Sequence, residues 1–268
     1  MKKYGGRSIR VKFVLILIVL AVLFTPAFGQ TTAGDWYEKG INSYDKGFYD
    51  SAVKYFDRVL ELRPSDNDAL TYKGYALNKQ GKYDEAIESL NKAIDINPQD
   101  ANALFYKGTI FVTQSKYDEA IEALDRAITI NPQYTKAWYV KGIVLNELSK
   151  YDEAIEAFDE VIQINPQNAD AWYSKAVALS EMSKYNESIE AYDNAIRINP
   201  QDANAWFGKG NALYSLSKFD EAIKAYDNAI QIDPELSIAW YNKGLALEAI
   251  GRKSESEVAF ANAKVLGL

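Results

Sequence analysis

The side chains of this sequence best suited to chemistry are neighbouring carboxylates, such as Asp118-Glu119 and Asp152-Glu153. Two close carboxylates could act as a general acid and a general base. These pairs return at the same place in most copies of a repeated segment, whereas an active site is unique. We therefore assign the pairs to structure and expect that the protein is not an enzyme.

Composition excludes several other kinds of site. The chain contains neither cysteine nor histidine, which excludes thiol nucleophiles, Ser-His-Asp triads, disulfides and the usual zinc ligand sets. It also has no glycine-rich phosphate loop and no calcium-loop motif. We predict no catalytic residue, no metal site and no cofactor.

The element that positions the remaining side chains of interest is a repeat of 34 residues. Its copies start at residues 33, 67, 101, 135, 169, 203 and 237, without insertion or deletion, and the last copy is shortened at Leu268. A fixed period in this range is typical of stacked repeats that contact mainly their neighbours. We therefore expect one array over residues 30–268, preceded by a separate segment over 1–29.

Each copy contains two helical patterns. In the copy at 135–168, apolar and small residues recur with helical spacing, first around Trp138 and then around Phe158. Ser149 separates the two patterns, and other copies have glycine at this place, which suits a tight turn. Pro166 ends the second pattern because proline cannot continue a helix. Each copy is predicted to form a helix, a turn and an antiparallel helix.

This pattern resembles the tetratricopeptide repeat, which has set places for Trp, Gly, Leu, Tyr, Ala, an aromatic residue and Pro. The copy at 135–168 fills these places with Trp138, Gly142, Leu145, Tyr151, Ala154, Phe158 and Pro166. The match recurs in all seven copies, although a lysine replaces the usual leucine before the glycine in each. Ala176 and Ser188 are further departures in the fifth copy. The resemblance implies an all-α, right-handed superhelical solenoid of seven helix-turn-helix units.

The resemblance also implies that the first helices line an inner groove in which peptides or partner helices bind. Here the predicted lining is aromatic residues and asparagines, which offer contact area and pairing to a peptide backbone. The predicted groove residues are Tyr37, Tyr75, Phe105, Tyr139, Asn146, Tyr173, Phe207, Asn211, Tyr214 and Tyr241. The alternative is that the rings pack mainly on one another and on neighbouring helices.

The lysines that replace leucine have a second predicted role. Each lies on the stripe that should face the second helix of the preceding unit, where an aspartate recurs. The predicted pairs are Lys73–Asp57, Lys141–Asp125, Lys175–Asp159, Lys209–Asp193 and Lys243–Asp227. Lys107 would face Asn91. The alternative is that the lysines extend into solvent.

The segment before the array has the features of an export signal. It begins with five positive residues, which are Lys2, Lys3, Arg7, Arg10 and Lys12. An apolar run over 13–24 follows, and then Ala27-Phe28-Gly29, which has small residues at the two places that a signal peptidase recognises. A signal peptide over 1–29 is predicted, with an uncleaved membrane anchor as the alternative. Its removal would change the net charge from −7 to −12. An acidic chain repels phosphate backbones, so we expect no nucleic-acid partner.

These features predict a non-catalytic scaffold that binds a protein or peptide partner and is secreted or held at the cell surface. The alternative is a structural envelope protein that associates weakly with itself through apolar residues near its end, such as Val265 and Leu266. A carbohydrate-binding module or an enzyme is the third hypothesis. Asn186-Glu187-Ser188 is a candidate glycosylation site in an exported protein.

Overall fold

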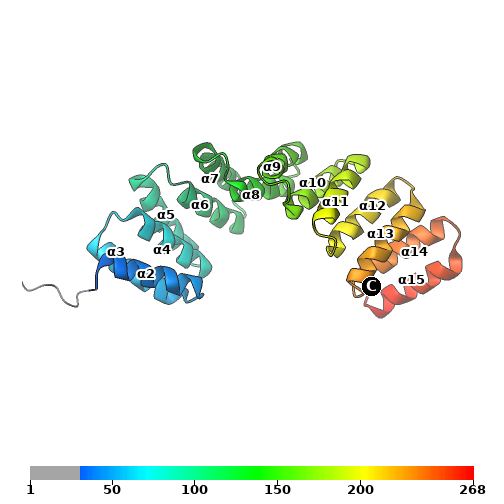
Figure 1. Ribbon diagram of the computed structural model, residues 1–268, viewed down its shortest axis with the longest axis horizontal. Coiled ribbons are helices and arrows are strands. Elements are labelled where there is room, and N and C mark those ends of the chain that lie inside the picture. The colour runs from blue at the N-terminus through cyan, green and yellow to red at the C-terminus, as the bar shows by residue number, and fades with distance from the viewer. Residues whose placement is uncertain (1–30) are drawn as a thin grey trace, which may run out of the picture.

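The structure, a computed structural model, describes residues 31–268, and the predicted signal segment and its apolar run at 13–24 lie outside them. All regular structure in the described part is helical (Figure 1). The helices are α2 (Ala33–Asp45), α3 (Tyr49–Leu62), α4 (Asn67–Lys79), α5 (Tyr83–Ile96), α6 (Ala101–Thr113), α7 (Tyr117–Ile130), α8 (Thr135–Glu147), α9 (Tyr151–Ile164), α10 (Ala169–Glu181), α11 (Tyr185–Ile198), α12 (Ala203–Ser215), α13 (Phe219–Ile232), α14 (Ser237–Ala249) and α15 (Lys253–Val265).

The fourteen described helices form seven consecutive pairs, which we call units one to seven. The first helix of each unit begins at the residue where a sequence copy starts, from Ala33 to Ser237. Several of these helices begin at a side-chain cap: Asp100, for example, accepts a hydrogen bond from the Ala103 backbone at 2.9 Å. A proline follows shortly after the second helix of units one to six, as at Pro64 after Leu62. The predicted all-α solenoid is confirmed.

The turn inside each unit requires a left-handed backbone. Gly47, Gly81 and Gly251 adopt it with φ between 75° and 79°, which costs glycine little. Units three to six have serine there instead, at Ser115, Ser149, Ser183 and Ser217, with φ of 57° or 58°. The turn is thus the same in all units, although four of them build it from a residue that disfavours it.

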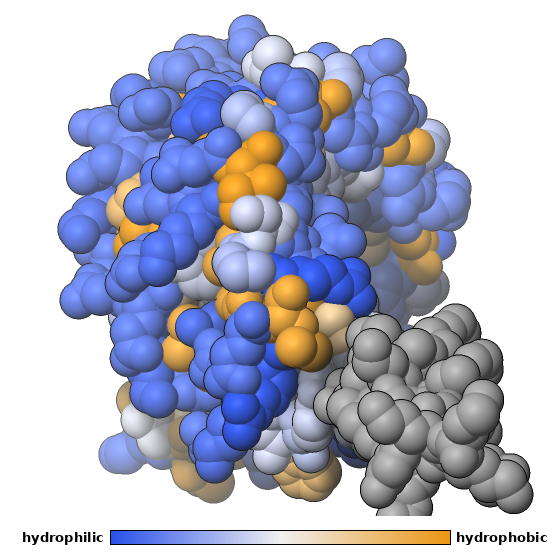
Figure 2. Space-filling view, turned by 90° about the vertical axis from the view of Figure 1, so that its left-hand side faces the viewer, coloured by the Kyte–Doolittle hydropathy of each residue, from blue (hydrophilic) through white to orange (hydrophobic). Residues whose placement is uncertain are grey.

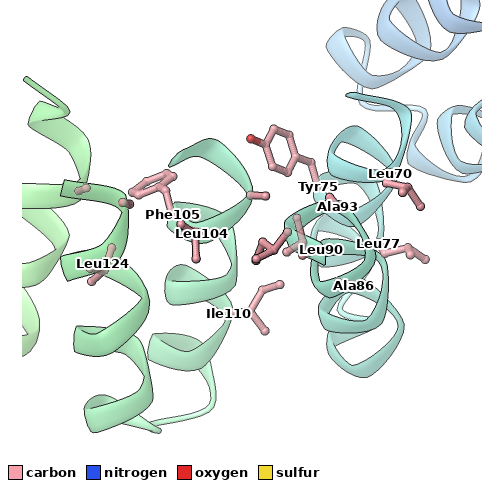
Figure 3. Close-up of a cluster of buried hydrophobic side chains, with 14 of the residues drawn as sticks. Leu70, Tyr75, Leu77, Ala86, Leu90, Ala93, Leu104, Phe105, Ile110 and Leu124 are labelled. Atoms are coloured by element: carbon pink, nitrogen blue, oxygen red, sulfur yellow. The ribbon is translucent and has the colours of Figure 1, made fainter. Parts of the chain in front are cut away.

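Inside every described unit except unit five, which has Ala176 at this place, a glycine of the first helix lets the second helix approach closely. A Cβ atom placed on Gly142 would lie 2.5 Å from the Phe158 ring, and one on Gly210 would lie 2.5 Å from the Tyr226 ring. Between units, apolar side chains form a continuous core. In Figure 3, Leu90 and Ala93 of α5 lie beside Leu104 and Ile110 of α6, and none of these four side chains is exposed to solvent.

Ion pairs join the first helix of five units to the second helix of the preceding unit. The five predicted lysine–aspartate pairs are all present, with N–O distances between 2.5 and 2.7 Å. Four of these lysines also lie over a tryptophan ring of their own helix. At the remaining junction Asn91 takes the place of the aspartate in the repeat, and Lys107 forms no ion pair within the described residues. Burial first, and then nearby Arg126, lowers the pKa of Lys107.

The stacked units form an arch (Figure 1). Successive first helices contact one another all along the array, from α2 and α4 to α12 and α14, whereas successive second helices of the described chain do not. The array therefore curves with its first helices on the inside. Figure 2 shows the N-terminal end of the arch as a largely hydrophilic surface crossed by a narrow strip of hydrophobic side chains.

Within residues 31–268, no helix is both long and apolar enough to cross a membrane. The same residues contain no group of three or more acidic side chains placed to hold a metal ion.

Candidate functional site

The inner surface of the arch carries one aromatic ring from the fifth place of most first helices. Five of these rings, all except Phe105, pack against an aromatic ring of the second helix in the same unit. The pairs and the distances between their centroids are Tyr37–Phe56 at 5.8 Å, Tyr139–Phe158 at 5.9 Å, Tyr173–Tyr192 at 5.8 Å, Phe207–Tyr226 at 6.0 Å and Tyr241–Phe260 at 5.4 Å. The second-helix rings hold the inner rings in place and are themselves mostly buried.

The inner rings of the later units keep one side open to solvent. Tyr139, Tyr173 and Phe207 are partly exposed, and 38% of Tyr241 is exposed. Packing within the protein and contact with a partner are therefore compatible for these rings, because one edge of each ring packs on the protein and the other edge is exposed to solvent. Side chains fixed in this way lose little conformational entropy when a partner covers them.

The prediction of an open groove is wrong for Tyr75 and Phe105, which are only 6% exposed. The sixth place of the first helix explains the difference. Units two and three have tyrosine there, and the rings of Tyr72 and Tyr106 pack on Tyr75 and Phe105. Tyr134 also lies against Phe105, with 5.0 Å between centroids. The inner surface of units two and three is thus filled by its own aromatic rings, whereas Tyr37 of unit one stays partly exposed.

Unit four has Val140 at the same sixth place, and units five to seven have the small or polar residues Ser174, Gly208 and Asn242. None of these residues adds a further ring beside the fifth-place ring. The hydroxyl groups of Tyr139 and Ser174 lie 3.3 Å apart and link units four and five. We call the inner surface from Tyr139 to Leu245 the open groove.

The most developed part of the open groove is a small cavity at units six and seven. It has a volume of about 210 Å³ and is lined by Asn211, Tyr214, Ser215, Tyr226, Asn242 and Leu245. The Asn211 side-chain oxygen accepts hydrogen bonds from the Tyr226 hydroxyl and the Asn242 amide, both at 2.9 Å. Its amide group donates no hydrogen bond within the described residues and so is available to donate to a ligand.

Sequence reasoning identified Asn211 and Tyr214 but missed Tyr226 and Asn242. Tyr226 lies on a second helix, whose residues were not considered as lining. Asn242 belongs to the next unit and reaches back across the junction. The signal that could have identified Asn242 is its sixth place in the repeat, where units two and three have tyrosine and units five to seven have small or polar residues.

Asn146, another predicted groove residue, contributes an unsatisfied acceptor. Its side-chain oxygen is buried and has no hydrogen-bond partner within the described residues. A buried acceptor without a partner is costly, and a donor from a ligand would relieve that cost.

The groove tyrosines act as neutral hydrogen-bonding groups. Burial, then Asp202 and Tyr139, raises the pKa of Tyr173 above its ordinary value. Burial, then Tyr214, raises the pKa of Tyr226 well above its ordinary value. Both hydroxyls are therefore protonated at physiological pH and can donate.

Asn186 lies exposed in the first turn of α11, so the candidate glycosylation site is on a helix rather than in a loop. The adjacent carboxylates, such as Asp118-Glu119, lie in the first turns of second helices. Negative charge is favourable at that end of a helix, which explains why they recur.

Comparison with known families supports the repeat assignment. A model described as tetratricopeptide repeat matches residues 107–169, 139–179, 173–237 and 217–264, which together span more than half of the chain. A model described as anaphase-promoting complex, cyclosome, subunit 3 matches residues 45–127. No curated protein matches the chain.

Several solved structures have a similar fold. The C-terminal part of a TPR repeat-containing protein from Cytophaga hutchinsonii superposes with a TM-score of 0.75 at 14% identity, covering 86% of this chain and 95% of that chain. YrrB, a TPR protein with an unusual peptide-binding site, has a TM-score of 0.64 at 20% identity and covers 70% of this chain and 97% of its own. MamA has a TM-score of 0.57 at 27% identity, covering 64% and 94%. The helix pairs, the repeated signature residues and the family match agree, and the chain belongs to the tetratricopeptide repeat family.

Proposed function

We propose that the protein is an exported, non-catalytic scaffold that binds an extended or helical segment of a protein partner in the open groove. The observation that carries the proposal is the row of half-exposed rings at Tyr139, Tyr173 and Phe207, which continues into the cavity around Asn211. Each ring is fixed from behind by a second-helix ring, and the asparagines beside them can pair with a peptide backbone.

Two further points support the proposal. The similar protein YrrB has a peptide-binding site, and tetratricopeptide repeats are a scaffold for binding proteins. Export to the cell surface is favoured by the N-terminal segment, which has positive residues, an apolar run and small residues at a potential signal-peptidase site. Membrane attachment would then depend on residues 13–24 remaining uncleaved.

A matched pair of double variants tests the groove. Tyr139→Ala with Tyr173→Ala removes two open rings, whereas Tyr151→Ala with Tyr185→Ala removes two tyrosines from the starts of second helices in the same units. In a pull-down from the surface of cells that make the protein, we expect the first variant to lose the partner and the second to retain it. Equal recovery of a partner by both variants would contradict the proposal.

Self-association is the second candidate function, and one observation favours it. The C-terminal end exposes Val258, Val265, Leu266 and Leu268, with Val265 at 85%. Concentration-dependent sedimentation that Val265→Asp abolishes would support association through this end. Sedimentation as a monomer at all concentrations would remove the candidate.

A further inference from the structure

Unit two lacks the tryptophan that units four to seven carry at the fourth place of the first helix. Its residue there is Leu70. In the four later units the indole nitrogen donates a hydrogen bond to the carbonyl oxygen of the proline that ends the preceding unit. These bonds are Trp138–Pro132 at 3.0 Å, Trp172–Pro166 at 3.1 Å, Trp206–Pro200 at 3.2 Å and Trp240–Pro234 at 3.2 Å.

The same four indoles lie under a lysine ammonium group. The distance from the lysine nitrogen to the ring centroid is between 5.2 and 5.7 Å, close enough for a cation–π interaction. Each of these lysines simultaneously pairs with the aspartate of the preceding unit. The repeat therefore contains a built indole site with a carbonyl acceptor, a cation over the ring and an apolar wall.

In unit two these three parts are present without an indole. Pro64, Lys73 and the apolar side chains Leu60, Leu70 and Leu77 line an open recess of about 270 Å³. The Pro64 carbonyl accepts no hydrogen bond within the described residues. Lys73 still pairs with Asp57 at 2.7 Å, and its side chain is 27% exposed, against 20–21% for the four lysines that cover a tryptophan.

Unit three provides the contrast, because it also has leucine at the fourth place but supplies a ring of its own. Phe111 stands where unit two has Leu77. The Lys107 nitrogen lies 5.8 Å from the Phe111 ring centroid, and Leu104 is fully buried. The lysine of unit three thus has a ring of its own helix beside it, whereas Lys73 has none within the described residues.

The charges around the recess favour a neutral occupant. Glu85 and Glu88 oppose Lys73 and Lys92 in its lining, and Glu88 pairs with Lys92 at 2.7 Å. The volume is slightly below the roughly 300 to 1,000 Å³ of pockets for complete small ligands. It suits one large side chain inserted from outside.

We propose that this recess receives a tryptophan side chain of a partner polypeptide. The indole would donate to the Pro64 carbonyl, lie beneath the Lys73 ammonium group and pack against Leu60, Leu70 and Leu77. Figure 3 shows Leu70 and Leu77 on one side of α4 and Tyr75 on another, so the recess is separate from the inner surface. The proposal does not depend on binding in the open groove.

The probe for the test is fluorinated N-acetyltryptophanamide, whose two amide groups imitate a peptide, observed by fluorine NMR with the purified protein. We expect a saturable shift with the wild type. Leu70→Trp installs the residue that four other units carry, and Leu77→Phe installs the ring of unit three. Each should fill the recess and weaken binding by roughly tenfold or more.

Ile96→Trp is the control, because it adds a tryptophan at an exposed residue outside the recess and should leave binding unchanged. Circular dichroism checks that each variant is folded, and either filling variant alone is sufficient for the test. The proposal is overturned if the wild type shows no saturable shift, or if the folded filling variants bind as well as the wild type. Binding of free fluoroindole but not of the blocked amide would also overturn it, since the recess would then take a small molecule.

Discussion

Lys107 shows how a lysine at a junction between units behaves without an aspartate partner. It lies between two units like the rest of the series, but Asn91 stands where an aspartate would be. Burial lowers its pKa, so its charged form costs stability in the folded state, and that cost is relieved only as the pH rises through the lowered pKa.

Asn91→Asp should supply the missing partner. We expect the pKa of Lys107 to rise and the free energy of unfolding to increase by about 0.5 kcal/mol, the usual size for a partly exposed pair. Denaturant unfolding measures the gain, and NMR of the lysine side chain measures the pKa. In a Lys107→Met background the same substitution should give no gain; an equal gain there would show that the effect does not come from the pair.

The sequence predicted the lysine–aspartate pairs because a fixed period gives the same two neighbours at every junction. It failed at Tyr75 and Phe105 for the opposite reason. Their burial depends on Tyr72 and Tyr106, which are particular to units two and three. A periodic pattern describes what the copies share and not what distinguishes one copy from another.

At the scale of the helix pair, stability depends on how closely the two helices approach. Gly142 lies against Phe158 so tightly that an added Cβ would be 2.5 Å from the ring. At Gly108 the nearest atom is a leucine carbon of Leu124 at 3.0 Å. An alanine should therefore be accommodated with a smaller shift at Gly108 than at Gly142.

Gly142→Ala should lower the free energy of unfolding by about 1 to 3 kcal/mol because it overpacks the helix interface. Gly108→Ala should change it much less, since the gain in helix propensity of about 1 kcal/mol offsets a milder overlap. Urea unfolding followed by circular dichroism compares the two variants. If both variants lose the same free energy of unfolding, the distance to the second-helix side chain does not determine how much an alanine destabilises the protein.

The helix boundaries were predictable from the sequence because their signals are local. Each turn carries glycine or serine, and Pro166 and its equivalents follow the second helices of units one to six. The cavity at Asn211 was not predictable in this way. It requires Tyr226 from α13 and Asn242 from the next unit to meet one side chain.

At the scale of the whole molecule, the inner surface of the arch differs along its length. Units two and three fill their inner surface with their own rings, and the recess at Leu70 lies on another face of α4. Units four to seven keep their inner rings partly exposed, and none of them has an aromatic residue at the sixth place. Since contacts between successive first helices fix the inner curve, a long partner segment would meet several units of a preformed surface at once.

The most direct test of the open groove is site-specific photocrosslinking in cells that make the protein. A photoreactive aromatic amino acid is placed at Tyr173, in the groove, or at Tyr185, at the start of the second helix of the same unit. We predict a crosslink to a defined partner protein from Tyr173 and none to that partner from Tyr185. A partner captured equally from both positions, or from Tyr185 alone, would contradict binding in the groove.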